Sequence, residues 1–281
     1  MRLALGTVQF GLDYGISNRA GEVADSELDS ILALARRLGV DTLDTAQAYG
    51  NAESRLGSRH TADFTMVSKL APGTSATNVV ACVDDSLQLL DRVRLDGLLL
   101  HRSQDADPAL FERLKDLQRQ GKVGKLGVSV YSPQELKHWL EEGHPLQLVQ
   151  LPANLLDQRF LRASWLDRLQ DMGCEIHVRS LFLQGLLLMQ PAMRPAYFES
   201  FAEPLARLDN WHPHLSPLVK ALSLTAAMPQ VSRFVVGVCH PHELAAIGAA
   251  HGHLPQWPDT ELASLACDAP ALINPAMWTS S

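Results

Sequence analysis

Cysteine is sparse in this sequence of 281 residues, and its four cysteines lie far apart, at Cys82, Cys174, Cys239 and Cys267. None of them belongs to a Cys-x-x-Cys pair, so the sequence indicates neither a zinc knuckle nor a disulfide framework. Unpaired thiols of this kind suit a reducing compartment.

The sequence also lacks a long apolar run and a basic cluster. Its longest apolar runs fall far short of the roughly 20 residues that a membrane-spanning helix needs. The formal net charge of −7 argues against a nucleic-acid partner. The stretch from Met1 to Gly6 enters a strand-like pattern at once, which leaves no room for a secretory signal. We therefore expect a cytoplasmic protein with no membrane and no nucleic-acid partner, whose oligomeric state the sequence does not indicate.

What is present is a regular alternation of short apolar runs and amphipathic stretches, typical of repeated strand-helix units around a parallel sheet. Most of the runs are nearly continuous in apolar residues, as strands buried on both faces should be. The eight runs centre on Leu3 to Leu5, Asp41 to Leu43, Phe64 to Val67, Gly97 to Leu100, Leu126 to Val128, Leu146 to Val149, Glu175 to Val178 and Arg233 to Val236. Helical patterns with the 3.6-residue period lie at 26–38, 78–90, 109–119, 133–142, 160–172 and 216–228. This arrangement favours an α/β fold of the closed (β/α)8 TIM-barrel type over an open doubly wound sheet.

A barrel of this type commonly occupies about 250 residues as one domain, so we expect residues 1–281 to form a single barrel domain. The longest interval between two strands contains an extended loop at about 183–215, which begins at the C-terminal end of the seventh strand. It is a candidate substrate loop, and a helical insertion packed beside the barrel is the alternative. A C-terminal segment at about 252–281 follows the last strand-helix unit.

Ionisable side chains follow three consecutive strands of this pattern: Asp44 and Tyr49 after the second, Lys69 in the third and His101 after the fourth. Each of them taken singly has an ordinary explanation in packing or solvation. Their joint arrangement is different, because catalytic groups collect at the C-terminal ends of barrel strands. The sequence therefore predicts that these four residues share one pocket.

The segments around these residues resemble the aldo-keto reductase family from about Leu3 to Leu244. The resemblance is carried by Leu5 to Gly11, Asp41 to Glu53, Ser68-Lys69, Leu100-His101, Gly127 to Ser129 and Gln150 to Asn154, which follow the family's order and approximate spacing. It implies an NAD(P)-dependent oxidoreductase that reduces an aldehyde or ketone, such as a sugar or a small aldehyde, to an alcohol. It also implies that Asp44, Tyr49, Lys69 and His101 are the catalytic tetrad.

Carbonyl reduction adds a hydride to carbon and a proton to oxygen. None of the tetrad side chains can donate a hydride, and the resemblance implies a nicotinamide cofactor, NADPH or NADH, as its source. The resemblance favours Tyr49 as the acid, and a nearby Lys69 ammonium is expected to lower the tyrosine pKa from about 10. Asp44 would hold Lys69 in place. His101 would orient the substrate oxygen or act as the acid itself.

The nicotinamide site is where the sequence departs from the family. No Gly-x-Gly-x-x-Gly follows the first strand, so a Rossmann-type site is not indicated, as is usual for this family. The resemblance implies that Ser129 and Gln150 hold the nicotinamide carboxamide. The family normally has an Asn after this Ser, but Val130 stands there, so we expect Asn154 or a water to take over its contact.

A second departure follows the seventh strand, where the family often stacks an aromatic residue on the nicotinamide. Arg179 stands near that place, and Phe182 is the expected substitute. Phosphates are expected at the start of the helix after the eighth strand, where helical N–H groups suit anions. Only His240 and His242 could attract a 2'-phosphate there and Glu243 would repel one, which leaves the preference between NADH and NADPH open. The other expected cofactor contacts are Gly6, Thr7, Ser180, Gly237, Val238 and Cys239.

Other functions fit parts of the same pattern. Lys69 could form a Schiff base in an aldolase or lyase, and a cofactor-bound interaction module without turnover could keep the same tetrad. Histidine pairs at 240 and 242, 212 and 214, and 251 and 253 could suggest a metal site, but no further ligand lies at a telling spacing, so we expect no metal.

Overall fold

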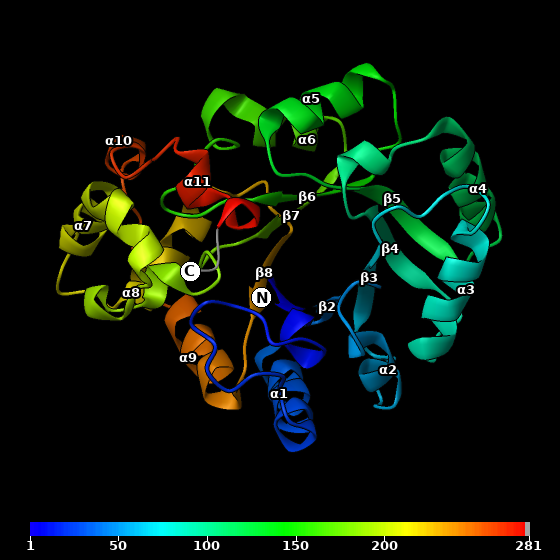
Figure 1. Ribbon diagram of the computed structural model, residues 1–281, viewed down its shortest axis with the longest axis horizontal. Helices are drawn as coiled ribbons and strands as arrows, with labels where there is room; N and C mark the ends of the chain where they lie inside the picture. The colour runs from blue at the N-terminus through cyan, green and yellow to red at the C-terminus, as the bar shows by residue number, and fades with distance from the viewer. Residues whose placement is uncertain (279–281) are drawn as a thin grey trace.

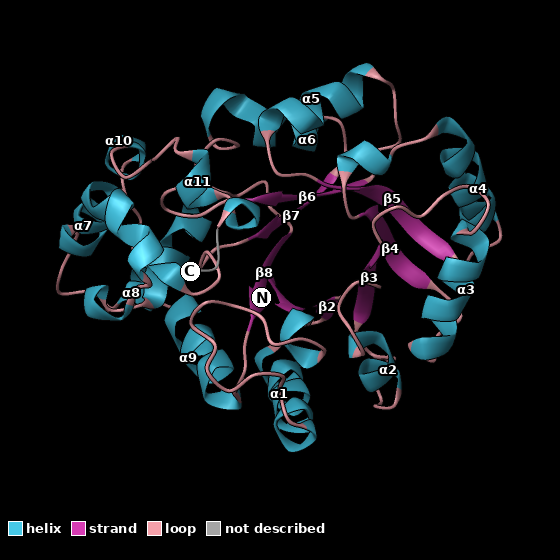
Figure 2. Cartoon of the chain, in the orientation of Figure 1, coloured by secondary structure: helices cyan, strands magenta, loops and turns pink. Residues whose placement is uncertain are grey.

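Eight parallel strands close into a barrel in their sequence order, β1 to β8, and the ring is completed where β1 pairs with β8. The computed structural model describes residues 1–278. Figure 1 shows the ring of strands in the middle of the molecule, and Figure 2 shows the helices arranged around its outside. The strands are β1 (Leu3–Gly6), β2 (Thr42–Asp44), β3 (Thr65–Leu70), β4 (Leu95–Leu100), β5 (Val123–Ser129), β6 (Leu148–Pro152), β7 (Glu175–Arg179) and β8 (Arg233–Gly237).

Helices follow most of the strands and cover the outer face of the barrel. The α-helices are α1 (Asp25–Leu38), α2 (Ala52–Gly57), α3 (Val79–Leu89), α4 (Pro108–Arg119), α5 (Pro133–Glu141), α6 (Trp165–Asp171), α7 (Ala202–Asn210), α8 (Pro217–Ser223), α9 (Pro241–His251), α10 (Asp259–Ala263) and α11 (Pro270–Ile273). This confirms the (β/α)8 TIM barrel predicted from the sequence. None of the helices among residues 1–278 combines the length and apolar character needed to cross a bilayer.

The strands are buried on both faces because one face fills the barrel and the other packs against helices. Val67, Leu99 and Leu148 contact one another as a small apolar cluster contributed by three strands. Gly97 makes room for them, since a Cβ at that position would lie 2.7 Å from Leu148 Cδ2. The barrel interior below the site is therefore a packed core.

Several predicted boundaries differ from the structure for local reasons. The pattern at 160–172 becomes a helix only from Trp165, because Ala163 and Ser164 take left-handed backbone angles of φ 61° and 54°. The pattern at 216–228 gives α8 only as far as Ser223 and then a tighter helix, η7 (Leu224–Ala227). The short helix α2, directly after Asn51, was not predicted.

The long interval between β7 and β8 divides into two parts. Its first residues lie at the mouth of the barrel, whereas α7 and the segments around it pack on the C-terminal segment beside the barrel, as Figure 1 shows. The Tyr197 hydroxyl donates to the Ala271 carbonyl at 2.8 Å, and the Trp211 indole donates to Glu261 at 2.7 Å. The first part of the interval therefore lies where a substrate loop would, and the later part is a helical insertion packed beside the barrel.

Candidate active site

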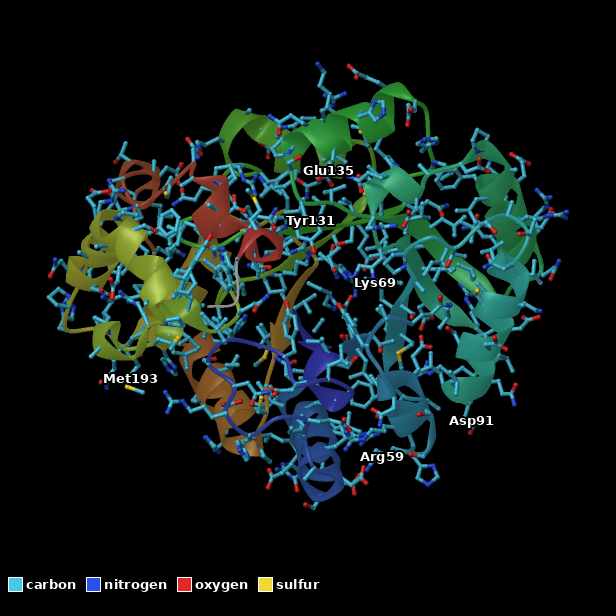
Figure 3. The ribbon with its side chains drawn as sticks, in the orientation of Figure 1. Arg59, Lys69, Asp91, Tyr131, Glu135 and Met193 are labelled. Carbon is cyan, nitrogen blue, oxygen red and sulfur yellow. The ribbon has the colours of Figure 1, made fainter. Side chains whose placement is uncertain are left out.

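A cavity of about 780 Å³ opens at the C-terminal ends of the barrel strands. Tyr49, His101, Ser129 and Gln150 all line it, and Lys69 lies buried beneath it. In Figure 3, Lys69 and Tyr131 lie toward the centre of the barrel. The structure thus brings the four residues of the predicted tetrad to one place, as expected from the common direction of the strands.

Asp44 and Lys69 form a buried ion pair, with Lys69 Nζ 2.6 Å from Asp44 Oδ1. The ammonium also donates to the Thr45 carbonyl at 2.9 Å and to the Tyr49 hydroxyl at 3.5 Å. The second Asp44 oxygen accepts from Gln150 Nε2 at 2.7 Å. Each hydrogen-bonding group of this ion pair thus faces a partner, which a buried charge requires.

The surroundings of Tyr49 act on its pKa in opposite directions. Burial raises the pKa of the Tyr49 hydroxyl, the Lys69 ammonium lowers it, and the Asp44 carboxylate raises it again. The net result is a pKa above the ordinary value. Lys69 therefore acts on Tyr49 in the predicted direction, but burial outweighs it, because removing the phenol from water penalises the phenolate. Tyr49 is protonated at neutral pH.

His101 lies beside Tyr49, with the two ring centroids 5.9 Å apart and the rings nearly perpendicular at 83°. Burial lowers the pKa of His101 to about 4, and the positive charges of Lys69 and Arg179 act in the same direction. His101 Nδ1 is buried without a hydrogen-bond partner. The imidazole is thus neutral at pH 7. It has one N–H donor and one acceptor nitrogen with which to bind a ligand.

The cavity contains further polar residues that the sequence reasoning did not identify, among them Gln9, Tyr14, Tyr131 and Gln184. Gln9 belongs to the segment from Leu5 to Gly11 that carries the family resemblance, and its Oε1 is buried without a partner. Tyr131 comes two residues after Ser129. Both could have been found by following each motif two or three residues beyond its strand.

A model of the aldo/keto reductase family matches residues 2–265. The chain belongs to the aldo-keto reductase family. A search of curated protein sequences found no match. The chain is similar to solved structures of this family, beginning with a Pseudomonas aeruginosa protein assigned to the aldo-keto reductases, which is 25% identical over 89% of each chain with a TM-score of 0.67.

Two more distant aldo-keto reductases share the fold over nearly the whole chain. An enzyme from Bacillus halodurans, in its holo form, is 19% identical with a TM-score of 0.77 and covers 99% of this chain and 95% of its own. A glycerol dehydrogenase from Gluconobacter oxydans is 20% identical with a TM-score of 0.70 and covers 98% of this chain and 92% of its own. Membership of the family indicates an oxidoreductase that acts on a small carbonyl compound and generally uses NAD(P)H.

Most of the residues expected to contact the cofactor line the cavity: Gly6, Thr7, Ser129, Gln150, Ser180, Phe182, Gly237, Val238, Cys239 and Glu243. Gly6 and Gly237 lie side by side in the register of β1 and β8, where neither has a side chain to project. A Cβ on Gly237 would lie 2.6 Å from Gln9 Nε2. The polar groups and the open floor of the cavity fit a nicotinamide cofactor.

Asn154 is the exception, because the structure does not bring it to the cavity. Its side chain is fully buried, donates to the Ser180 carbonyl at 3.2 Å, and accepts from the backbone N–H groups of Leu156 and Asp157 at 3.0 and 2.9 Å. These three bonds hold the loop after β6. Both ends of the Asn154 amide are therefore engaged in this loop, away from the cavity, and the residue is not placed to replace the missing family Asn.

Glu243 also caps a helix, a role that the sequence pattern did not reveal. Its carboxylate accepts from the backbone N–H groups of Cys239 and His240, at 2.7 and 3.3 Å, and so caps the start of α9. These are among the amides expected to hold phosphate. Glu243 therefore places a negative charge where the sequence reasoning expected a site for an anion.

The histidine pairs that could have suggested a metal site are those at 240 and 242, 212 and 214, and 251 and 253. Within the part of the chain that the structure describes, no group of three or more His, Cys, Asp or Glu side chains is arranged to hold a metal ion. His240 and His242 instead stack on each other with ring centroids 5.2 Å apart.

Proposed function

We propose that this chain reduces an aldehyde or ketone to an alcohol with NAD(P)H, and that Tyr49 is the general acid. The observation that carries the proposal is the position of the Tyr49 hydroxyl, which lies in the cavity wall 3.5 Å from Lys69 Nζ. Asp44 fixes the ammonium from the other side. A tyrosine held in this way can donate its proton to a carbonyl oxygen as negative charge develops there.

Protonation states support Tyr49 over His101 as the acid. The raised pKa of Tyr49, caused mainly by burial, keeps its proton in place at neutral pH, and Lys69 favours the phenolate that forms when the proton leaves. The pKa of His101, about 4, leaves that ring without the extra proton of an imidazolium acid. We propose that His101 orients the substrate oxygen through a hydrogen bond.

The bound nicotinamide would supply the hydride, which no side chain of the protein can donate. We propose that Ser129 and Gln150 hold its carboxamide, and that Gly6, Thr7, Ser180, Phe182 and Gly237 to Cys239 line its path. Ser129 Oγ lies 3.5 Å from Gln150 Oε1, and the other end of the Gln150 amide is bound to Asp44. The same glutamine would thus connect the cofactor site to the buried ion pair.

The surroundings of Lys69 argue against the Schiff-base alternative. An imine forms from a neutral amine. Burial alone would lower the pKa of Lys69, but Asp44 and Tyr49 outweigh burial and raise the pKa above its ordinary value. The ammonium form is therefore favoured, and it lies beneath the cavity.

A panel of aldehydes and ketones, assayed with NADH and NADPH in parallel, tests the proposal. We expect at least one carbonyl compound to be reduced, with loss of the absorbance of the reduced cofactor and formation of one alcohol per cofactor consumed. Cofactor binding without turnover on any member of a broad panel would instead support the non-catalytic interaction module.

A further inference from the structure

Arg179 carries a positive charge at the cavity without an anionic partner. It ends β7, and its guanidinium donates to Ser180 Oγ at 3.2 Å and to the Val130 carbonyl at 3.1 Å. It forms no ion pair with any carboxylate among residues 1–278. A guanidinium has five N–H donors. Several of them remain for a ligand, and a charge that a bound ligand removes from water needs a partner.

The position of this guanidinium is fixed by Tyr131. Arg179 Cζ lies 4.2 Å from the centroid of the Tyr131 ring. The Tyr131 backbone is itself held at both ends, because its N–H donates to Glu135 at 3.0 Å and its carbonyl accepts from Arg159 at 3.0 Å. Arg159 is bound through two nitrogens to the buried carboxylate of Asp157. The guanidinium is thus held in one position before a ligand binds, which favours specific recognition.

Arg179 acts on the same groups that would carry out the reaction. After burial and the Lys69 ammonium, it is a further cause of the low pKa of His101, and it also lowers the pKa of Tyr49, although burial raises that pKa overall. Its charge therefore influences the pKa values of the two residues, Tyr49 and His101, between which the substrate carbonyl would lie. An anion bound to Arg179 would lie close to a carbonyl group placed between Tyr49 and His101.

The nicotinamide end of a bound cofactor would not provide such an anion. The nicotinamide ring is uncharged when reduced and positively charged when oxidised, and the phosphates are separated from it by a ribose. A negative charge at this end of the cavity would therefore come from the substrate. Guanidinium pairs with carboxylate through two parallel hydrogen bonds, a geometry that neither lysine nor histidine reproduces.

We propose that Arg179 binds the carboxylate of the carbonyl substrate, so that the preferred substrates are aldehydes or ketones that also carry an acid group. The inference rests on the proposed function, since it names the substrate class of that same site. It makes Arg179 a specificity-determining residue, with Tyr131 as its positioning residue.

A matched substrate pair tests this directly: 4-carboxybenzaldehyde and its neutral methyl ester, methyl 4-formylbenzoate. We expect the unmodified protein to favour the carboxylate in kcat/KM by at least about tenfold, because a charged hydrogen-bonded pair contributes about 1.5 to 3 kcal/mol. In Arg179→Gln this ratio should fall close to one, mainly through KM, and Arg179→Lys should restore part of it. Arg19→Gln, which removes an exposed arginine from the same cavity, should leave the ratio within about twofold.

A binding measurement separates failure of the inference from failure of the proposed function. Titration of the cofactor-bound protein with 4-carboxybenzyl alcohol, followed by cofactor fluorescence, requires no turnover. Weaker binding to Arg179→Gln than to the unmodified protein supports the inference even if neither aldehyde is reduced, an outcome that would overturn only the proposed function. If Arg179→Gln instead weakens cofactor binding and lowers kcat/KM for acid and ester by the same factor, Arg179 serves the cofactor and the inference is overturned.

Discussion

Lys69 Nζ lies 2.6 Å from Asp44 Oδ1, and both side chains are buried below the active-site cavity. Asp44 ends β2 and Lys69 comes from the neighbouring strand β3, so the pair joins two strands at their C-terminal ends. The same ammonium is 3.5 Å from the Tyr49 hydroxyl. One ion pair therefore serves both the barrel and the proposed proton donor, and removing either partner should affect stability and chemistry together.

Replacing Tyr49 with phenylalanine should abolish most of the carbonyl reduction while leaving cofactor binding nearly unchanged. Only the hydroxyl is removed, and a general acid typically contributes about a hundredfold to ten-thousandfold to the rate. Steady-state rates and cofactor fluorescence titrations measure the two effects. Tyr197→Phe is the matched control, because that hydroxyl is bound to Ala271 outside the cavity. Near-normal turnover of Tyr49→Phe would remove Tyr49 from this role.

Lys69→Met should destabilise the protein by about 3 to 5 kcal/mol, because Asp44 would remain as a buried carboxylate with only the Gln150 amide beside it. Denaturant unfolding measures the loss. Lys115→Met, which breaks an exposed pair with Glu112, should cost only about 0 to 1 kcal/mol. The double variant Lys69→Met/Asp44→Asn should recover part of the loss. Equal losses of unfolding free energy in Lys69→Met and Lys115→Met would contradict a buried, coupled pair.

His101 should not titrate in the range usual for histidine. Burial, Lys69 and Arg179 lower its pKa to about 4, so the ring stays neutral when pH falls from 8 to 5. We expect no decrease in kcat/KM from protonation of His101 near pH 6.5. A decrease in kcat/KM should appear only toward pH 4. Initial rates across this range, with circular dichroism at each pH to confirm that the protein is folded, provide the test. An acid limb near 6.5 that disappears in His101→Gln would show that the ring is more solvated than the structure indicates.

The sequence predicts the barrel, and the meeting of four ionisable side chains at one end of it, because both depend on topology. Asp44 and His101 come at or after strand ends, and parallel strands bring their ends together whatever the details of packing. The pKa of Tyr49 could not be predicted, since it depends on how far the phenol is removed from water. Asn154 had the right chemistry for the cofactor but is turned into its own loop. Glu243 was recognised as a carboxylate, whereas its capping of α9 depends on helix geometry that begins two residues earlier.

Glu175 should make stability depend on pH at the end of β7 opposite the cavity. A hydrogen bond with His177 at 2.8 Å, opposed by burial and reinforced by Lys125, lowers the pKa of Glu175 from 4.5 to about 2. Because the pKa is lower in the folded protein, the ionised carboxylate stabilises the fold above pH about 4.5, and this contribution is lost as pH falls through about 2. Glu175→Gln should therefore be less stable at pH 7, and its difference from the unmodified protein should shrink as pH falls from about 4.5 to about 2. If the unfolding free energies of Glu175→Gln and the unmodified protein differ by a constant amount across this range, Glu175 does not cause the pH dependence. Glu112→Gln, at an exposed position, is the control.

Glu243 should weaken the binding of a 2'-phosphate through its charge, separately from its role as a helix cap. Its carboxylate accepts from the N–H groups of Cys239 and His240 and also lines the cavity. In Glu243→Gln the amide oxygen can still accept these bonds, but the negative charge is gone. Removing one repulsive charge near solvent is worth on the order of 1 kcal/mol, so NADPH binding should tighten roughly fivefold relative to NADH binding. Fluorescence titrations of both cofactors measure this, and the gain should diminish at high salt because mobile ions screen exposed charges. If the affinities for NADPH and NADH change by the same factor at every salt concentration, Glu243 acts on the cofactor only by capping α9, and the 2'-phosphate lies elsewhere.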